Sequence, residues 1–164
     1  MTNAHRLETD IKQTKPFVSA YQEAALSILY TADALRHHYA QVITPFGVTP
    51  QQYNVLRIVR GAGEAGIPSL EIAERMIERS PGMTRLLDRL EEKNLVTRTR
   101  SREDRRVVFC NLTMQGAALL KRMDPHIKKG EERALESLET SSLRELTRLL
   151  SDVRGSLDES RRVA

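Results

Sequence analysis

Several residue types that define whole classes of protein are rare or absent in this chain of 164 residues. Cysteine occurs once, at Cys110, which excludes an intrachain disulfide, and tryptophan is absent. No apolar run approaches the roughly 20 residues that span a bilayer, and the N-terminus lacks the apolar stretch of a signal peptide. We therefore expect a cytoplasmic protein with no membrane partner. A content of 40% hydrophobic and 29% charged residues is ordinary for a folded domain.

Residue patterns that support catalysis or cofactor binding are also missing. No Ser/His/Asp or paired-carboxylate pattern occurs, and the glycines of residues 61–66 lack the spacing of a phosphate-binding loop. The adjacent His37 and His38 would point about 100° apart on a helix and have no ligand cluster beside them, which favours a surface pair over a metal site. Cys110 is expected on an apolar strand face, where thiols are inert. The sequence thus predicts no enzyme, metal or cofactor.

What the sequence does have is a positive charge surplus in one place. The net charge is +4, and residues 79–106 hold nine Lys/Arg against five Asp/Glu, while the rest of the chain is balanced. A clustered surplus of this kind is typical of proteins that bind nucleic acid, although a solvated basic surface is the plain alternative. The motifs around the charges decide between the two interpretations.

Both ends of the chain show the spacing of helices with an unpartnered apolar seam. Residues 17–46 contain no internal glycine, and their apolar residues follow one another at steps of four and three. This seam comprises Tyr21, Ala25, Ile28, Ala32, Leu35, Tyr39, Val42 and Phe46. A second seam begins after Thr140 or Ser141 and comprises Leu143, Leu146, Leu150, Val153 and Leu157. One chain could pair its own seams, but a second copy would bury both more completely, so we expect a homodimer.

Two short helices are expected next, before the basic stretch. Thr49-Pro50-Gln51-Gln52 has the form of a capping box and predicts a helix that runs to Gly61. The pair Ile67-Pro68 then serves as a short link, after which Ser69 can cap a second helix. The apolar face of that helix is predicted to comprise Ile72, Ala73, Met76 and Ile77.

A third helix and a hairpin form the basic stretch itself. Ser80-Pro81 is expected to start the helix, and Asn94 is suited to end it in a left-handed conformation. Its buried stripe is predicted to comprise Met83, Leu86, Leu87 and Leu90. From Leu95 to Leu112 the period changes from 3.6 to 2, which indicates two strands around a charged tip. Residues 114–138 then read as a further helix with Ala117, Leu120, Met123 and Ile127 on one face, in which Pro125 should produce a kink.

This order of elements predicts a winged helix-turn-helix, whose second helix enters the major groove of DNA. On that helix, the residues near the start that face outward or flank that face are Ser80, Gly82, Thr84, Arg85 and Arg89. We expect Arg85 to read guanine and Arg89 to contact a phosphate. The wing tip carries Arg102, Asp104, Arg105 and Arg106. An arginine there can enter a minor groove while a neighbouring carboxylate holds its guanidinium.

The run from Val48 to Gly116 resembles the MarR family of bacterial regulators. The resemblance rests on VTPQQYNVLRIV, SLEIAERM, SPGMTRLLDRLEEKNLVTR and DRRVVFCNLTMQG. It implies an obligate homodimer built from the first and last helices, a minor-groove contact by Arg106, and a small-molecule pocket between the lobes. For such an effector pocket the polar candidates are His37, His38, Tyr39 and Arg57.

The resulting expectation is a mostly α fold, a winged helix-turn-helix with a two-stranded wing. We expect residues 1–46 and 114–164 to form the dimerisation helices and residues 47–113 to form the DNA-binding lobe, all in one integrated unit. The expected function is a sequence-specific regulator, a repressor released by a small molecule, that binds palindromic double-stranded DNA as a homodimer. Two alternatives remain open: a winged-helix module that docks a protein, and a non-specific architectural DNA binder.

Overall fold

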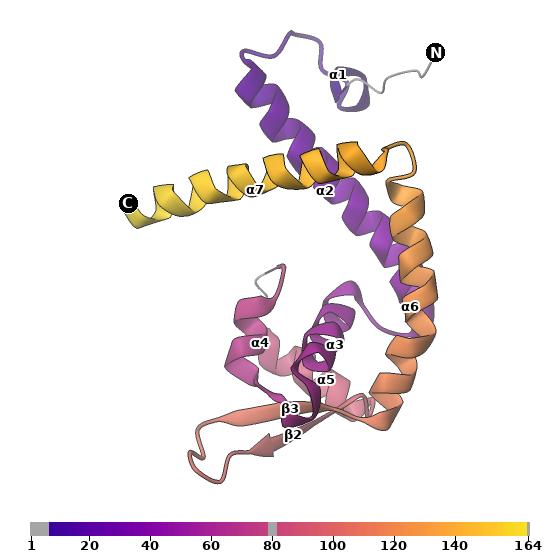
Figure 1. Cartoon of the computed structure of the whole chain (residues 1–164), viewed down its shortest axis with the longest axis vertical. Coiled ribbons are helices and arrows are strands. Elements are labelled where there is room, and N and C mark those ends of the chain that lie inside the picture. Colours follow the sequence, from indigo (N-terminus) through magenta and orange to yellow (C-terminus); the bar gives the residue numbers. More distant parts are fainter. Residues whose placement is uncertain (1–6, 79–81, 164) are drawn as a thin grey trace. The chain divides into compact units, whose positions relative to one another are not determined.

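The computed structural model describes residues 7–78 and 82–163, with side chains up to residue 158. The chain forms two compact units, residues 1–128 and residues 129–164. The helices and strands (Figure 1), in chain order, are α1 (Leu7–Asp10), α2 (Ala20–Ile43), η1 (Thr44–Phe46), α3 (Pro50–Ala62), η2 (Gly63–Ala65), β1 (Ile67–Pro68), α4 (Ser69–Arg75), α5 (Met83–Glu92), β2 (Val96–Arg100), β3 (Val108–Leu112), α6 (Met114–Ala134) and α7 (Thr140–Val163). No helix in the described ranges is long and apolar enough to cross a membrane.

Local hydrogen bonds explain where α2 and α3 begin. Ser19 caps α2, because its hydroxyl accepts a hydrogen bond from the backbone N–H of Gln22 at 3.2 Å. The predicted capping box at α3 is confirmed: the Thr49 hydroxyl accepts from the N–H of Gln52 at 3.2 Å, and the Gln52 side chain accepts from the N–H of Thr49 at 3.0 Å. A cap of this kind stabilises a helix by about 1 kcal/mol.

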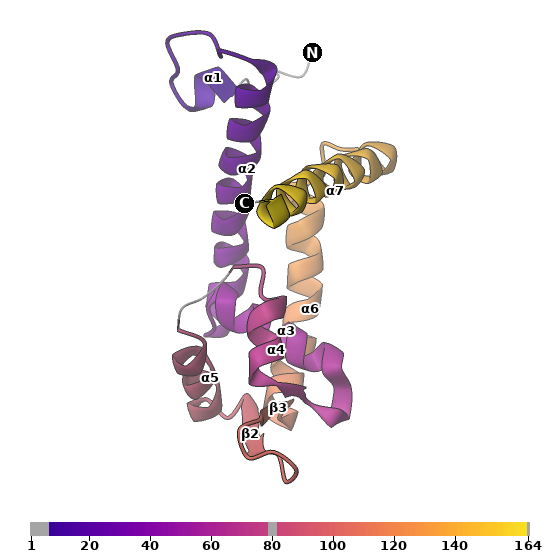
Figure 2. The ribbon, with the colours of Figure 1, turned by 90° about the vertical axis from the view of Figure 1, so that its left-hand side faces the viewer.

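The helices α3, α4 and α5 pack against a small sheet and form the core of the first unit (Figure 2). The predicted stripe of α5 is confirmed, since Leu86, Leu87 and Leu90 are buried. Met83, at the start of the stripe, is partly buried and packs against the same core. Asn94 ends the helix region with φ 54°, the left-handed conformation expected for it.

The sheet has a third strand that the sequence analysis did not predict. Its order is β1-β3-β2 with antiparallel pairing, and Ile67 of β1 lies opposite Cys110 of β3. The pair Ile67-Pro68 is therefore a strand rather than a link. The expectation that Ser69 caps α4 was also wrong, because Pro68 occupies the N-cap position and the Ser69 hydroxyl donates to the carbonyl oxygen of Val108 at 3.1 Å.

Two helices end earlier than the apolar spacing suggested. Helix α4 ends at Arg75, and Met76 is already extended, with φ −66° and ψ 137°. Met76 stays buried, but Ile77 is 83% exposed, so its predicted place on the buried face was wrong. Helix α6 ends at Ala134 instead of Leu138.

Helix α6 runs through Pro125 and buries a slightly rotated face. Leu120, Met123 and Ile127 are buried as expected. Ala117 is exposed, and Gly116 is buried in its place against the backbone of Leu95. The absence of a side chain at Gly116 thus allows the start of α6 to lie directly on the turn that follows α5.

Candidate nucleic-acid interface

Helix α5 presents its cations away from the core. Arg85 and Arg89 are exposed, as is Thr84, on the side opposite the buried leucines. The helix begins after Gly82, which is half-buried at the N-cap position and provides no side-chain cap. Ser80, predicted to start the helix and to contact DNA, lies outside the described residues. Arg85 and Arg89 therefore make the exposed side of α5 cationic.

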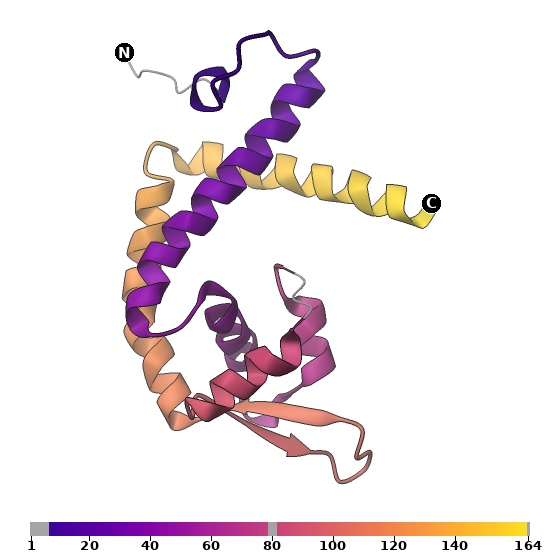
Figure 3. The same cartoon turned by 180° about the vertical axis from the view of Figure 1, so that it is seen from behind.

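The wing is the β2–β3 hairpin, whose tip extends beyond the helices of the first unit (Figure 3). Arg102, Arg105 and Arg106 are all exposed at this tip. The Ser101 hydroxyl accepts from the backbone N–H groups of Glu103 and Asp104 at 3.2 and 3.3 Å. These bonds organise the turn and leave the arginine side chains in solvent.

Asp104 has a different partner from the one predicted. Its Oδ1 accepts a hydrogen bond from the backbone N–H of Arg106 at 2.9 Å, whereas the sequence predicts that the carboxylate holds an arginine side chain. A short Asp side chain reaches the amide two residues ahead more readily than a guanidinium at the end of a flexible stem. Asp104 therefore shapes the tip, and the guanidinium of Arg106 is exposed.

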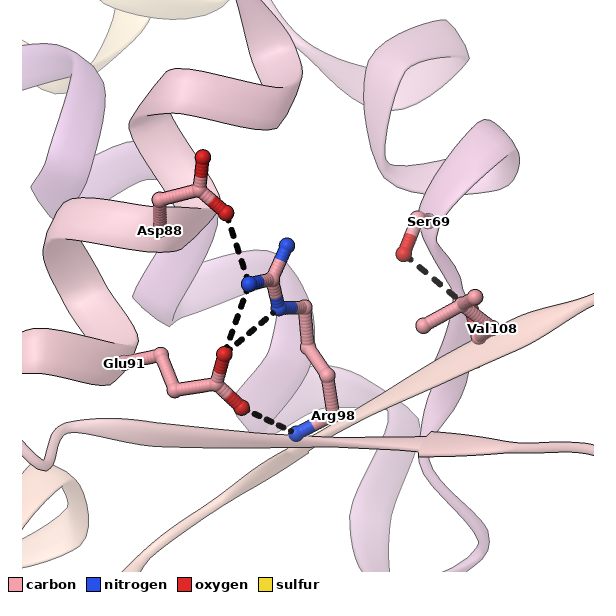
Figure 4. A network of polar contacts seen from close by, with 5 residues as sticks. All are labelled: Ser69, Asp88, Glu91, Arg98 and Val108. Atoms are coloured by element: carbon pink, nitrogen blue, oxygen red, sulfur yellow. Dashed lines mark hydrogen bonds and ion pairs between the residues drawn. The ribbon is translucent and has the colours of Figure 1, made fainter.

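An ion-pair network joins α5 to the wing (Figure 4). One nitrogen of Arg98, Nη2, lies 2.6 Å from Oδ1 of Asp88 and 2.6 Å from Oε2 of Glu91. Nε of Arg98 also donates to Oε2 of Glu91 at 2.9 Å, and the backbone N–H of Arg98 donates to Oε1 at 3.0 Å. The hydrogen bond to Glu91 is the main reason why the pKa of Arg98 is raised above its usual value.

Sequence reasoning missed this network. Asp88 and Arg98 entered the sequence analysis only as separate charges of residues 79–106, but the two are paired with each other. The available signal was the spacing of Asp88 and Glu91, which places both carboxylates on one helix face. The network contains two carboxylates and one guanidinium and is therefore negative overall. The other residues of 79–106 consequently carry a larger positive net charge than the whole stretch does.

The four residues suggested for an effector pocket lie on α2 and α3. His37 is exposed, and its Nδ1 lies 2.9 Å from the carbonyl oxygen of Asp33. The rings of His38 and Tyr39 meet edge to face at 6.3 Å, and Arg57 donates to Oδ1 of Asn54 at 3.0 Å. These contacts orient the side chains without defining a cavity.

A concave region of about 600 Å³ occurs elsewhere on the first unit, between α1 and the N-terminal half of α2. Its lining residues are Leu7, Glu8, Asp10, Glu23, Ser27, Tyr30, Thr31 and Ala34. None of the four predicted effector residues is among them.

The apolar seams at the two chain ends are only partly exposed in the single chain, because Tyr39, Val42 and Phe46 of the first seam pack against the chain's own core. On α2, Tyr21 is 90% exposed and Ile28 is 37% exposed. On α7, Leu146, Val153 and Leu157 are exposed, whereas Leu143 and Leu150 are half-buried.

The single thiol and the histidines have no metal-binding surroundings in the described parts of the chain, where no cluster of three potential ligands occurs. Cys110 is fully buried, and burial raises the pKa of its thiol from 9.0 to about 11. This thiol is therefore protonated at neutral pH, in agreement with the expectation of an unreactive strand residue.

Comparisons with known proteins identify the relatives of this chain. Residues 48–108 match the model of the MarR family. The transcriptional repressor MdtR of Bacillus subtilis is 44% identical over 70 residues, which cover 43% of this chain and only 44% of that protein, less than half of its length.

Two solved structures extend the similarity over most of the chain. A MarR transcription factor from Planctomyces limnophilus is 39% identical with a TM-score of 0.65, and the match covers 83% of this chain and 98% of that one. A C80S mutant of MarR from E. coli, solved with operator DNA, is 26% identical with a TM-score of 0.70, covering 77% of this chain and 89% of that one. The chain therefore belongs to the MarR family of transcription regulators, which are not enzymes.

Proposed function

We propose that this protein binds specific double-stranded DNA sites as a homodimer and represses transcription until a small-molecule effector releases it. The observation that carries the proposal is the joint exposure of Arg85 and Arg89 on α5 and of Arg106 on the wing tip. Together they give one unit a cationic helix for the major groove and a cationic loop for the minor groove. The operator DNA in the E. coli MarR structure supports the same partner here.

The proposed division of labour follows the elements. Residues 47–113 contain α3, α4, α5 and the wing and would read the DNA. Residues 1–46 and 114–164 would supply the dimer interface, for which the exposed seam residues of α2 and α7 provide apolar surface. A two-fold dimer presents two copies of α5, so its operator would be palindromic with half-site centres about 10 base pairs apart.

Effector release is the finer part of the proposal. His37, His38, Tyr39 and Arg57 are polar, and they lie on the helices that connect the dimerisation region to the DNA-reading lobe. A ligand bound there in one dimer conformation only would shift the population toward that conformation and so change DNA affinity.

DNA binding can be tested with a library of randomised duplexes from which the wild-type protein enriches its preferred sequences. The enriched and random duplexes are then titrated across a salt series. We expect preferential binding to the enriched duplex, and affinity that falls steeply with salt because bound arginines release counterions from phosphates. Arg60→Ala controls for the loss of an arginine side chain as such, since Arg60 is an exposed arginine of α3 that is paired with Asp124 of α6.

The same experiment separates the alternatives. A protein-interaction module would bind no duplex even at low salt. An architectural DNA binder would bind all duplexes with similar affinity. Either result would contradict the proposed regulator.

A further inference from the structure

The cluster of Asp88, Glu91 and Arg98 connects the two elements that the proposed function assigns to different grooves. Arg98 lies at the centre of β2, opposite Cys110 of β3, whereas Asp88 and Glu91 are one turn apart on α5 (Figure 4). We propose that Arg98 is a positioning residue, which fixes α5 against the wing so that Arg85 and Arg106 engage one DNA site together. This inference rests on the proposed function.

The geometry of the contacts restrains both sliding and rotation. The guanidinium is planar, and its nitrogens bind carboxylates that come from two successive turns of α5. Glu91 binds the Arg98 backbone N–H with one oxygen and the Arg98 side chain with the other. Apolar packing between α5 and β2 alone would tolerate small shifts, whereas these hydrogen bonds are directional.

The side chain of Arg98 is less exposed than the arginines that are proposed to face DNA. Its side chain is 24% exposed, compared with 43% for Asp88 and 39% for Glu91. Arg100 and Arg102, further along the wing, are exposed. With two carboxylates within hydrogen-bond distance, Arg98 is neutralised inside the protein and contributes no free cation for a phosphate.

The distance between the cluster and the wing tip means that a small rotation at the cluster produces a larger displacement at the tip. Arg98 is the middle residue of β2, and Arg106 lies past the end of that strand. A small change in the angle between β2 and α5 would therefore displace Arg106 further than it displaces Arg98. Loss of the cluster should disturb the minor-groove contact more than the major-groove contact.

The test compares Arg98→Met, which keeps a long side chain but removes the charge, with Arg98→Lys and with Arg60→Met. Arg60→Met is the matched control because Arg60 also binds a carboxylate, that of Asp124, at 2.9 Å, but joins α3 to α6. Affinity is measured base by base across the enriched duplex, at a temperature at which circular dichroism shows every variant folded. The salt dependence of binding is measured on the same duplex.

We expect Arg98→Met to keep the base preferences at the major-groove positions and to lose about tenfold in preference at the flanking positions that the wing reads. Its salt dependence should match that of the wild type. Arg98→Lys should restore part of the flanking preference, because one ammonium can bind one carboxylate at a time. Arg60→Met should resemble the wild type in both measurements.

A double-mutant cycle provides a second readout. In the wild-type background, losses caused by Arg85→Ala and Arg106→Ala should be coupled, and in the Arg98→Met background they should become additive. If Arg98→Met does not fold, Glu91→Gln is used instead, since it keeps an acceptor for the Arg98 backbone N–H.

Three results would overturn the inference. A flatter salt dependence with an unchanged flanking preference would show that Arg98 contacts phosphate directly. A uniform loss of affinity at all positions would show a merely structural role. Absence of binding by the wild type on every duplex would overturn the proposed function as well. This result is distinguishable from the other two because it is measured on the wild type, before any variant is compared with it.

Discussion

Asp88 and Arg89 are neighbours on α5 and yet have opposite roles. Asp88 turns toward the wing and binds Arg98, whereas Arg89 is exposed. Arg85 is exposed one turn before Arg89, whereas the carboxylates of Asp88 and Glu91 on the same helix bind Arg98. A residue's partner, rather than its charge alone, decides whether it is available to DNA.

Arg85 and Arg106 should fail in different ways when each is replaced by alanine. We expect Arg85→Ala to relax the base preference at one position of each half-site, because a bidentate contact to guanine contributes about 1–3 kcal/mol of discrimination. Arg106→Ala should weaken binding with little change at the major-groove positions. Base-by-base affinity profiles measure both effects. If Arg85→Ala kept the wild-type preferences, the assignment of Arg85 to base reading would be wrong.

Cys110 should make stability pH-dependent in alkaline solution. Burial raises the pKa of its thiol from 9.0 to about 11, so between these values the folded state keeps a proton that the unfolded chain releases. Stability therefore falls as pH rises through this window, by at most about 1.4 kcal/mol per pH unit.

Urea denaturation of the wild type and of Cys110→Ala at a series of pH values between about 8 and 11 measures this effect. The variant will be less stable throughout because it leaves a cavity, but its stability should decline less steeply with pH. An equal decline of stability with pH in the two proteins would contradict the raised pKa of Cys110.

At the scale of elements, sequence periodicity predicted those whose pattern extends over several turns. The leucine stripe of α5, the capping box at Thr49 and the left-handed Asn94 are all determined by neighbours in sequence. The strand β1 has only two residues and therefore no period, and its pairing with β3 comes from a distant segment.

The same limit explains the missed network and the misplaced Ile77. The pairing of Arg98 with Glu91 depends on how α5 lies across β2, which no local pattern encodes. Ile77 continues the apolar spacing of α4, but the chain has already left the helix at Met76. Long-range packing thus decided the details for which the sequence alone was insufficient.

The contact between α6 and the turn after α5 predicts a strong effect of one added methyl group. A Cβ at Gly116 would clash with the carbonyl oxygen of Leu95 and lie 2.9 Å from Cδ1 of Leu112. We expect Gly116→Ala to lower the free energy of unfolding by about 1–3 kcal/mol or more, since backbone must move. Gly61→Ala is the control, because Gly61 lies in α3 with open space around its Cβ position.

That control should be neutral or stabilising by up to about 1 kcal/mol, as alanine is the better helix former. Chemical denaturation of the three proteins measures the difference. Equal stability of Gly116→Ala and the wild type would show that α6 does not lie on the Leu95 turn.

For the whole molecule, the two partly exposed seams are separated in sequence by the entire proposed DNA-reading lobe. Val153 and Leu157 on α7 are 42% and 59% exposed, and Tyr21 on α2 is 90% exposed. Apolar surface of this extent on both chain ends is typical of protein–protein contacts. The proposed function assigns both seams one occupant, a second copy of the chain.

Replacing Leu150 on α7 with glutamate should convert the protein to a monomer and abolish tight binding to a palindromic duplex. The charge would be buried without a partner in an apolar interface, at a cost of several kcal/mol, roughly 2–7 by transfer scales for unpaired polar groups. Ser151→Glu is the matched control, because Ser151 is exposed on the same helix and lies outside the seam. Sedimentation at micromolar concentration measures the assembly, and titration of one-half-site and two-half-site duplexes measures its consequence. Because a dimer holds two copies of α5, only the wild type and Ser151→Glu should favour the two-half-site duplex. A wild-type monomer that bound a single half-site tightly would show that the seams close within one chain.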